Sequence, residues 1–412
     1  MAERQAAVDI EKLVYGGDGL ARVEGQIALI PFVLPGERVT TALVSSKSGI
    51  LRGISPQIQT PSPERVTPGC EYFTACGGCH YQHANYPFQL EQKRAIFLET
   101  LQRLGGIISD RDVQVRSGPP WQYRNRIQLH FEERQVGFRR ADSHELCPIS
   151  HCPISSPMLN EVIGRFVTAV KQPQWPDFLR SLEAFTNEAE VQLRVTESLR
   201  PVAVRFFDWC GTFLPLAPGP IEYNAAGHTF RVSRGSFFQV NRFLVDSLVD
   251  EALGQSSGAR AIDLYAGAGL FSLALARRFE HVDAAERAAP AFRDLEWNAS
   301  RAAPNVNAHK TSAEEFLHSV TETPDLIVAD PPRAGLERDT VSELLRIAPH
   351  RLTLISCDTA TLARDLKKLL PAYGIRKVTI IDLFPQTYHM EAVIQLENAA
   401  SGAHQSFPST GH

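Results

Sequence analysis

The sequence lacks any long apolar run. No stretch of its 412 residues approaches the roughly 18 consecutive apolar residues that a membrane helix requires. The start MAERQAAVDIEKL also lacks the apolar segment of a signal peptide. We therefore expect a cytoplasmic protein that does not cross a membrane.

The chain also lacks an excess of positive charge, internal repeats and coiled-coil heptads. Its formal net charge is -4, with 43% hydrophobic and 21% charged residues, which is ordinary for a globular protein. A protein that is basic all over is excluded. A local basic face for nucleic acid is not, because binding depends on where the charge lies. The length is sufficient for two or three domains.

Disulfide bonds are not expected, because the seven cysteines are an odd number in a chain without an export signal. In such a protein, clustered cysteines indicate a metal site, and isolated ones indicate packing or catalysis. Cys70, Cys76 and Cys79 form a cluster, whereas Cys357 stands alone.

The N-terminal part, residues 1–62, is predicted to be all-β. Between residues 8 and 55, short β-rich runs are separated by the turn sequences GGDG, EGQ and LPGE. Five strands of this kind favour a small barrel of the oligonucleotide-binding (OB) type. Residues 63–232 contain a helical pattern from Tyr86 to Leu104 and several alternating strands, which predicts a mixed α+β central region.

Residues 233–398 change to strands that alternate with helices. This pattern predicts a doubly wound α/β domain with a seven-stranded sheet, in which ligands bind at the carboxyl ends of the strands. The polar tail, residues 399–412, is predicted to be disordered.

The first strand of this domain leads into a turn of small residues, YAGAG, with Gly267 and Gly269 before a helix. Such a turn lets a nucleotide-like cofactor approach the backbone. The third glycine of a dinucleotide fingerprint is missing, because Ser272 stands near its place. Glu286 ends the second strand, where an acid can accept hydrogen bonds from both ribose hydroxyls of an adenosine group.

Three more side chains are expected at the same edge of the sheet. Asp330 ends the fourth strand and is fixed by the two prolines after it. Cys357 follows the fifth strand, and Glu391 starts a last strand that would run antiparallel. A thiol and a carboxylate beside a methyl or hydride donor favour covalent catalysis with proton removal. A packing role for Cys357 is the alternative.

Five motifs resemble a known family. SFFQVN (236–241), DLYAGAG, DPPRAG, SCDTATLARD and DLFPQTYHMEAV occur in the order found in the RNA uridine-C5 methyltransferases that use S-adenosylmethionine, the 5-methyluridine family. The match spans residues 233–397. The N-terminal part resembles a TRAM domain, and the spacing C-x5-C-x2-C is similar to that of the iron-sulfur branch that acts on 23S ribosomal RNA. The resemblance implies a class I methyltransferase fold and an RNA substrate with an unpaired or flipped uridine.

The resemblance also implies a role for each site residue. Cys357 would add to C6 of the uracil, which makes C5 nucleophilic toward the methyl donor, and Glu391 would remove the C5 proton. The positions implied to bind the cofactor are Gln239, Tyr265, Glu286 and Asp330.

The chain departs from the family at two places. Many members have an acid after the third strand that holds the adenine amino group, and this chain has Thr311 and Ser312 there, so that contact is not implied. Thr359 replaces a frequent proline after the Cys-Asp pair, a change that is compatible with a helix N-cap.

The cysteine cluster supplies three thiolates, and an iron-sulfur cluster of the 4Fe-4S type needs a fourth. Zinc knuckles usually pair two C-x2-C units, and only one is present. The resemblance implies the ligands Cys70, Cys76, Cys79 and Cys152, because CPISSPMLN is similar to the family's segment after its fourth ligand. Cys147, in its own CPIS context, remains open as the fourth ligand.

Other functions remain open. A cytosine-C5 methyltransferase would have a cysteine in the fourth-strand motif, which here is DPPRAG, and an amino-group methyltransferase would have an aromatic residue in place of Arg333. A transfer RNA substrate fits the same motifs. A non-catalytic iron-sulfur module that only binds RNA would require neither Cys357 nor Glu391.

Overall fold

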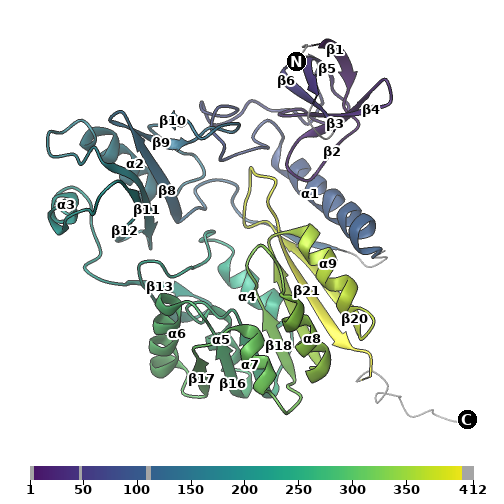
Figure 1. Cartoon of the computed structure of the whole chain (residues 1–412), viewed down its shortest axis with the longest axis vertical. Helices are drawn as coiled ribbons and strands as arrows, with labels where there is room; N and C mark the ends of the chain where they lie inside the picture. The colour runs from purple at the N-terminus through teal and green to yellow at the C-terminus, as the bar shows by residue number, and fades with distance from the viewer. Residues whose placement is uncertain (1–3, 46–48, 108–112, 401–412) are drawn as a thin grey trace, which may run out of the picture.

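A computed structural model gives the structure of the chain and describes residues 4–45, 49–107 and 113–400. Most of the predicted tail, from residue 401 on, lies outside the described residues. The described part contains three larger β-sheets, helices that cover them and a separate two-stranded hairpin (Figure 1).

The N-terminal sheet has six strands among the described residues, where five were expected. Their order is β1-β5-β6-β4-β3-β2. Along β5, buried and less buried residues alternate, as expected for a strand with one inward face. The bounds are β1 (Arg4–Asp9), β2 (Lys12–Leu13), β3 (Gly19–Val23), β4 (Gln26–Ile30), β5 (Arg38–Ser45) and β6 (Leu51–Thr60).

A helix, α1 (Tyr86–Thr100), follows the cysteine cluster. It begins at Asn85, whose side chain accepts a hydrogen bond from the backbone N–H of Phe88 at 3.0 Å. Its last turn is a π-turn, η1 (Leu101–Gly105), and the chain leaves it through Gly106 in the left-handed conformation, with φ 67°. The helical prediction for this segment is therefore confirmed, with a wider final turn.

The central region has a five-stranded sheet in the order β10-β9-β8-β11-β12. Two helices pack against it and share an apolar cluster with it, which includes Leu129, Phe166 and Leu182. The bounds are β8 (Arg126–Glu132), β9 (Gln135–Arg139), β10 (Leu146–Pro148), α2 (Pro157–Ala169), β11 (Leu179–Thr186), β12 (Val191–Ser198) and α3 (Val204–Cys210).

The C-terminal sheet has the order β17-β16-β15-β18-β19-β21-β20-β7. All seven segments predicted as strands are confirmed. They are β15 (Gly258–Leu264), β16 (Phe279–Ala285), β17 (Val306–His309), β18 (Leu326–Ala329), β19 (Arg351–Ser356), β20 (Tyr373–Ile381) and β21 (Glu391–Asn398). The helices between and before them are α4 (Val245–Leu253), α5 (Leu270–Leu275), α6 (Ala289–Ala302), α7 (Ala313–Ser319), α8 (Arg338–Ile347) and α9 (Thr359–Leu369).

The prediction of seven strands in this sheet is wrong by one. An eighth strand, β7 (Gln114–Arg116), comes from the preceding part of the chain and pairs in parallel with β20. Three residues are too few to show a strand pattern in the sequence, and their place is set by contacts with residues 379–381. A hairpin, β13 (Ile221–Ala225) and β14 (His228–Val232), also packs its apolar residues into the core of this domain.

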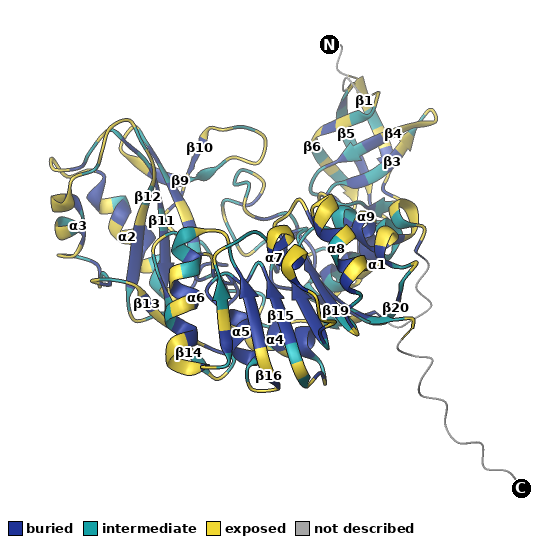
Figure 2. Ribbon diagram, turned by 60° about the horizontal axis from the view of Figure 1, so that its bottom comes forward, coloured by how far each residue is buried: buried dark blue, intermediate teal, exposed yellow. Residues whose placement is uncertain are grey.

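Strand direction decides what lies at each edge of the sheet. β15 to β19 are parallel, whereas β21 lies between β19 and β20 and runs antiparallel to both. The central parallel strand β18 is apolar throughout and all four of its residues are buried, because helices cover both faces of the sheet (Figure 2).

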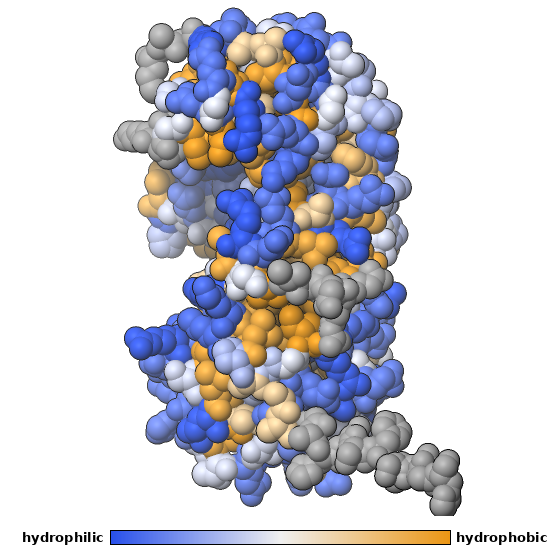
Figure 3. Space-filling model, turned by 90° about the vertical axis from the view of Figure 1, so that its right-hand side faces the viewer, coloured by the Kyte–Doolittle hydropathy of each residue, from blue (hydrophilic) through white to orange (hydrophobic). Residues whose placement is uncertain are grey.

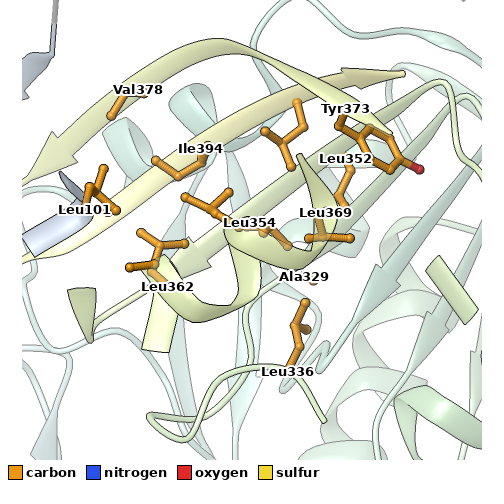
Figure 4. Packing of buried hydrophobic residues seen from close by; sticks show 14 of the residues in the cluster. Leu101, Ala329, Leu336, Leu352, Leu354, Leu362, Leu369, Tyr373, Val378 and Ile394 are labelled. Carbon is orange, nitrogen blue, oxygen red and sulfur yellow. The ribbon is translucent and has the colours of Figure 1, made fainter. Parts of the chain in front are cut away.

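One apolar cluster joins parts that are far apart in the sequence. It contains Leu13 and Leu34 of the N-terminal part, Phe97 of α1, and the buried residues of β19, β21 and α9. Figure 4 shows Leu101, at the end of α1, pointing toward the residues of α9 and the sheet. The N-terminal sheet and α1 are thus packed on the C-terminal domain.

Apolar side chains are mostly inside, and the surface is largely hydrophilic. The face in Figure 3 shows hydrophilic residues at the top and bottom, with apolar residues gathered near the middle. No helix in the described ranges is long and apolar enough to cross a membrane.

A core substitution should destabilise the C-terminal domain. Leu354 in β19 is 2% exposed, and we expect Leu354→Ala to lower the free energy of unfolding by about 2–5 kcal/mol through lost burial and a residual cavity. Leu345→Ala, on the exposed side of α8, is the matched control, with an expected cost within about 0.5 kcal/mol. Equal urea midpoints for the two variants would contradict this packing.

Candidate active site

Two predicted residues, Cys357 and Glu391, face each other because β21 is antiparallel to β19. Ser356 at the end of β19 pairs with Ala392 near the start of β21. One step further along, this register puts Cys357 opposite Glu391, and directly opposite residues in such a pair have Cβ atoms about 5 Å apart. The structure therefore brings the thiol and the carboxylate together.

Asp330 joins them from the neighbouring strand. It follows β18, which pairs in parallel with β19 so that Ala329 lies beside Leu354. The amide of Gln239 approaches its Oδ2 at 3.5 Å, which is a weak hydrogen bond. Two carboxyl groups and one thiol thus share one partly enclosed edge of the sheet.

Burial and like charge shift the protonation of all three groups. Burial raises the pKa of Asp330 to about 7, and burial together with Asp330 raises the pKa of Glu391 well above its ordinary value. The pKa of Cys357 is raised to about 12, first by burial and then by Glu391 and Asp330, with Arg333 opposing them. In the free protein the Cys357 thiol is therefore protonated at neutral pH. The raised pKa of Glu391 makes its carboxylate a stronger proton acceptor than an exposed glutamate.

The turn after β15 has the backbone conformation that its glycines allow. Gly267 and Gly269 have φ of 58° and 92°, in the left-handed region. A Cβ atom on Gly269 would approach Leu295 to 2.9 Å, whereas one on Gly267 would meet open space. Gly269 is therefore required by packing, and Gly267 leaves the backbone open to a ligand.

Ser272, at the place of the missing third glycine, has a different function. Its hydroxyl donates a hydrogen bond of 2.5 Å to Oδ2 of Asp263, a fully buried carboxyl group at the end of β15. Burial raises the pKa of Asp263 to about 7, and the Ser272 bond opposes that rise.

A shallow pocket of about 30 Å³ lies at this turn. It brings together three of the four residues predicted to bind the cofactor, Gln239, Tyr265 and Asp330, with Phe237 and Gly267 beside them. Tyr265 has a φ of 62°, an uncommon conformation for an aromatic residue, and its hydroxyl donates to Glu337 at 2.6 Å.

The fourth, Glu286, lies next to this pocket and is bound to the turn. Its Oε2 accepts a hydrogen bond from the backbone N–H of Gly267 at 2.9 Å, and its Oε1 accepts one from Ala288 at 2.5 Å. The carboxylate therefore fixes the glycine turn and retains lone pairs for ribose hydroxyls.

Comparison with known proteins places the chain in a family. Residues 221–399 match the family described as tRNA (Uracil-5-)-methyltransferase. An uncharacterized RNA methyltransferase of Aquifex aeolicus is 31% identical over 96% of this chain and 99% of its own length. The 23S rRNA (uracil(1939)-C(5))-methyltransferase RlmD of Vibrio parahaemolyticus is 30% identical over 96% of this chain and 97% of its own.

A solved structure agrees over nearly the whole length. The tRNA (uracil-54, C5)-methyltransferase of Pyrococcus abyssi, in complex with S-adenosyl-L-homocysteine, has a TM-score of 0.74 and 26% identity, and the match covers 95% of this chain and 100% of that one. The chain belongs to the RNA uracil-C5 methyltransferase family. It is an S-adenosylmethionine-dependent RNA uracil-C5 methyltransferase with a class I methyltransferase fold.

In this methyltransferase, the departures from the family pattern have structural reasons. Ser312 caps α7 in a capping box with Glu315, and Thr311 also donates to Glu315, so these hydroxyls are occupied in holding the helix start. The prediction that Thr359 caps α9 is wrong. Asp358 is the N-cap, and Thr359 occupies the first helical position, where a proline is also well tolerated.

The four cysteines predicted to be cluster ligands line a second, larger cavity, which shares no residue with the cofactor pocket. This cavity of about 340 Å³ is lined by all four predicted ligands, Cys70, Cys76, Cys79 and Cys152, but not by Cys147. Burial, with smaller effects from neighbouring thiols, raises the pKa of Cys76 and of Cys79 to about 12. Among the described residues, no three or more His, Cys, Asp or Glu side chains are arranged to hold a single metal ion.

Sequence reasoning did not identify four residues beside the nucleophile. Tyr15, in the turn after β2, donates to Oδ2 of Asp358 at 3.1 Å, and its ring packs edge-on against Tyr388 at 5.6 Å. Arg333 lies 3.6 Å from Asp358, and the two tyrosine hydroxyls raise the pKa of its guanidinium. The GGDG sequence after Tyr15 indicated only a turn, because a contact across 343 positions leaves no local signal.

The raised pKa of Cys357 predicts slow, strongly pH-dependent alkylation. Because only the thiolate reacts, the rate at which iodoacetamide modifies Cys357 should still increase above about pH 9, as followed by peptide mass spectrometry. Glu391→Gln should speed the reaction at about pH 8, since it removes a negative charge that disfavours the thiolate. Glu343→Gln, on α8, serves as the control. A rate that levels off near about pH 8 would disprove the raised pKa.

Proposed function

We propose that this enzyme methylates C5 of a uridine in 23S ribosomal RNA, in the cytoplasm. The observation that carries the chemistry is the placement of Cys357 opposite Glu391 at the edge of the sheet. The substrate rests on relatives named 23S rRNA (uracil(1939)-C(5))-methyltransferase RlmD, which are similar over almost their whole length, as in Pectobacterium atrosepticum, 32% identical over 93% of that protein.

Covalent activation begins with Cys357. Carbon C5 of uracil is a poor nucleophile, so the Cys357 thiol first releases its proton to solvent, its sulfur bonds to C6, and the C5–C6 π electrons move to form an enolate. S-adenosylmethionine, when bound, supplies the methyl group as an electrophile. C5 of the enolate then carries both a hydrogen and a methyl group while the sulfur remains on C6.

Glu391 completes the turnover. Its carboxylate takes the proton from C5, the electrons of that C–H bond restore the C5–C6 double bond, and the bond from C6 to the Cys357 sulfur breaks. The burial that raises the pKa of Glu391 makes its carboxylate a stronger base than an exposed glutamate. The Cys357 sulfur leaves with the electrons of the broken bond and takes up a proton, which restores the thiol of the free protein.

The cofactor pocket has suitable residues for S-adenosylmethionine. Tyr265 offers a ring for stacking, Glu286 offers acceptors for ribose hydroxyls, and Gln239 and Asp330 border the same pocket. Gly267 keeps the backbone open at the place where the cofactor would lie.

The cysteine cavity supports an iron-sulfur cluster, which we propose to be 4Fe-4S. Its four lining thiols fit the cysteine ligands that such a cluster takes. A cluster is wider than a single ion, so its ligands stand further apart than those of a single metal ion. Cys152 lines the cavity and Cys147 does not, which favours Cys152 as the fourth ligand.

The proposed domains follow from these assignments. Residues 1–62 would be a TRAM-type OB barrel, residues 63–232 the central region with the cluster, and residues 233–398 the methyltransferase domain. The first two would hold RNA around the flipped uridine.

A transfer RNA substrate is the second candidate. It is favoured by the likeness to the P. abyssi enzyme, which is named for uracil 54 of tRNA. A module that only binds RNA is a poorer explanation, since binding alone does not require a thiol opposite a buried carboxyl group.

Mass mapping of 5-methyluridine tests the function. Cells without this protein should lack one or more methyl groups in 23S ribosomal RNA, with uridine 1939 the first to examine. The wild-type gene should restore them and Cys357→Ala should not. Loss of methyl groups from transfer RNA alone would make transfer RNA the substrate in place of 23S ribosomal RNA. No loss in either RNA would refute the methyltransferase assignment for these RNAs.

The cysteine assignment predicts distinct effects of four substitutions. Protein purified without oxygen should contain iron and acid-labile sulfide. Cys76→Ser and Cys152→Ser should lose both, whereas Cys147→Ser should retain them and Cys210→Ser, a buried core residue, should affect only stability. Stoichiometric zinc without sulfide would contradict the cluster. Loss of iron and sulfide in Cys147→Ser with retention in Cys152→Ser would make Cys147 the fourth ligand.

A further inference from the structure

The buried face of α1 is unusual because its first half is polar, whereas Ile96 and Phe97 further along are apolar. Gln89 is 1% exposed and Lys93 is not exposed at all, although both lie on the side of the helix that packs against the C-terminal domain. A buried amide and a buried ammonium group are costly unless each finds partners. Together with Tyr86, at helical spacing, they direct their polar atoms to one segment of the chain.

That segment is the 382–390 loop, which joins β20 to β21 and ends directly before Glu391. Lys93 donates to Oδ1 of Asp382 at 2.6 Å and to the backbone carbonyl of Phe384 at 3.0 Å. The Tyr86 hydroxyl donates to the other oxygen of Asp382 at 2.8 Å. Figure 1 shows the loop, in yellow, rising from the sheet beside α1.

Gln89 and Gln386 form a reciprocal pair. The Gln89 amide donates to Oε1 of Gln386 at 3.0 Å, and the Gln386 backbone N–H donates to Oε1 of Gln89 at 3.1 Å. Gln386 has a φ of 68°, and its carbonyl accepts from the backbone N–H groups of His80 and Tyr81. The loop thus has a strained conformation that its neighbours maintain.

The backbone of the loop is held along its first half. The carbonyl of Leu383 accepts from Asn241 at 3.1 Å, and that of Pro385 accepts from the Tyr123 hydroxyl at 3.1 Å. With the bonds to Phe384 and Gln386, four consecutive carbonyls have side-chain or backbone donors from elsewhere in the chain. Among the contacts of α1 with this loop, the one between Lys93 and Asp382 is an ion pair.

We propose that Lys93 is a positioning residue for proton removal from C5, acting through Asp382 and the 382–390 loop on Glu391. This inference rests on the proposed function. Loss of the ion pair would let the loop move and displace the base. Addition of Cys357 to C6 depends less on this loop, since Cys357 belongs to β19 and the α9 turn. Loss of the ion pair should therefore slow proton removal from C5 more than it slows the addition of Cys357 to C6.

The test is a single-turnover experiment with excess enzyme, S-adenosylmethionine and an RNA substrate. The double variant Lys93→Met/Asp382→Leu removes both charges, so neither is left buried alone. Denaturing gels and mass spectrometry separate free RNA from RNA bound to protein and show whether the bound RNA carries the methyl group. We expect release of methylated RNA to slow at least about tenfold, which is less than the roughly 10²–10⁴-fold contribution of a general base because Glu391 is displaced and not removed. Adduct formation should change much less, so that methylated RNA accumulates on Cys357.

A control breaks a partly buried ion pair between α4 and the same sheet. Glu251 of α4 is 7% exposed and accepts from Lys377 of β20 at 2.6 Å, away from the 382–390 loop. Lys377→Met/Glu251→Leu should destabilise the protein without accumulation of the adduct. If this control accumulates the adduct as strongly as the Lys93 double variant, the effect is general loosening of the fold and the proposal fails.

Two further variants separate failure of the proposed role of Glu391 from failure of the positioning role of Lys93. Glu391→Gln should accumulate the methylated adduct. If it does not, the role of Glu391 as the base is refuted; if it does and the Lys93 variant does not, only the positioning role is refuted. Should the double variant not fold, Lys93→Gln/Asp382→Asn, which removes both charges and keeps polar side chains of similar size, replaces it. A normal release rate in Lys93→Gln/Asp382→Asn would then overturn the proposal.

Discussion

The direction of β21 is the constraint on which the active site depends. A parallel strand in its place would start at the opposite edge of the sheet, and Glu391 would be far from Cys357. Because β21 runs antiparallel between β19 and β20, its first residue meets the end of β19. Strand pairing therefore brings the nucleophile and the proposed base together, and the 382–390 loop leads directly into the first residue of β21.

This arrangement has an electrostatic cost that other parts of the molecule offset. Asp330 and Glu391 lie close together in a largely buried site, and both have raised pKa values. A charged uracil enolate would add a further negative charge. Arg333, which lies 3.6 Å from the Asp358 carboxylate that also accepts from Tyr15, opposes the rise in the pKa of Cys357. The N-terminal sheet thus contributes to the active site, and its packing on the apolar cluster of the C-terminal domain fixes that contribution.

The parts that could be predicted from the sequence are those with a local signal. The seven strands of the C-terminal domain, the glycine turn and the edge at which Asp330 and Cys357 lie follow from apolar runs, turn residues and the topology of parallel sheets. β7, the Tyr15 contact and the polar face of α1 do not, since each depends on partners more than 200 positions away. Lys93 and Gln89 are polar residues on the buried side of α1, so they weaken its amphipathic pattern. The residues that they bind lie far ahead in the sequence, in the 382–390 loop.

The central claim is that Cys357 and Glu391 act on opposite ends of the same C5–C6 bond. A crystal structure of the enzyme with S-adenosylmethionine and an RNA that carries 5-fluorouridine at the target position tests it most directly, because a C5 fluorine cannot leave as a proton does. The account predicts a bond between the Cys357 sulfur and C6, a methyl group on C5 and the Glu391 carboxylate facing C5. A bond from another residue, or a Glu391 carboxylate remote from C5, would contradict it.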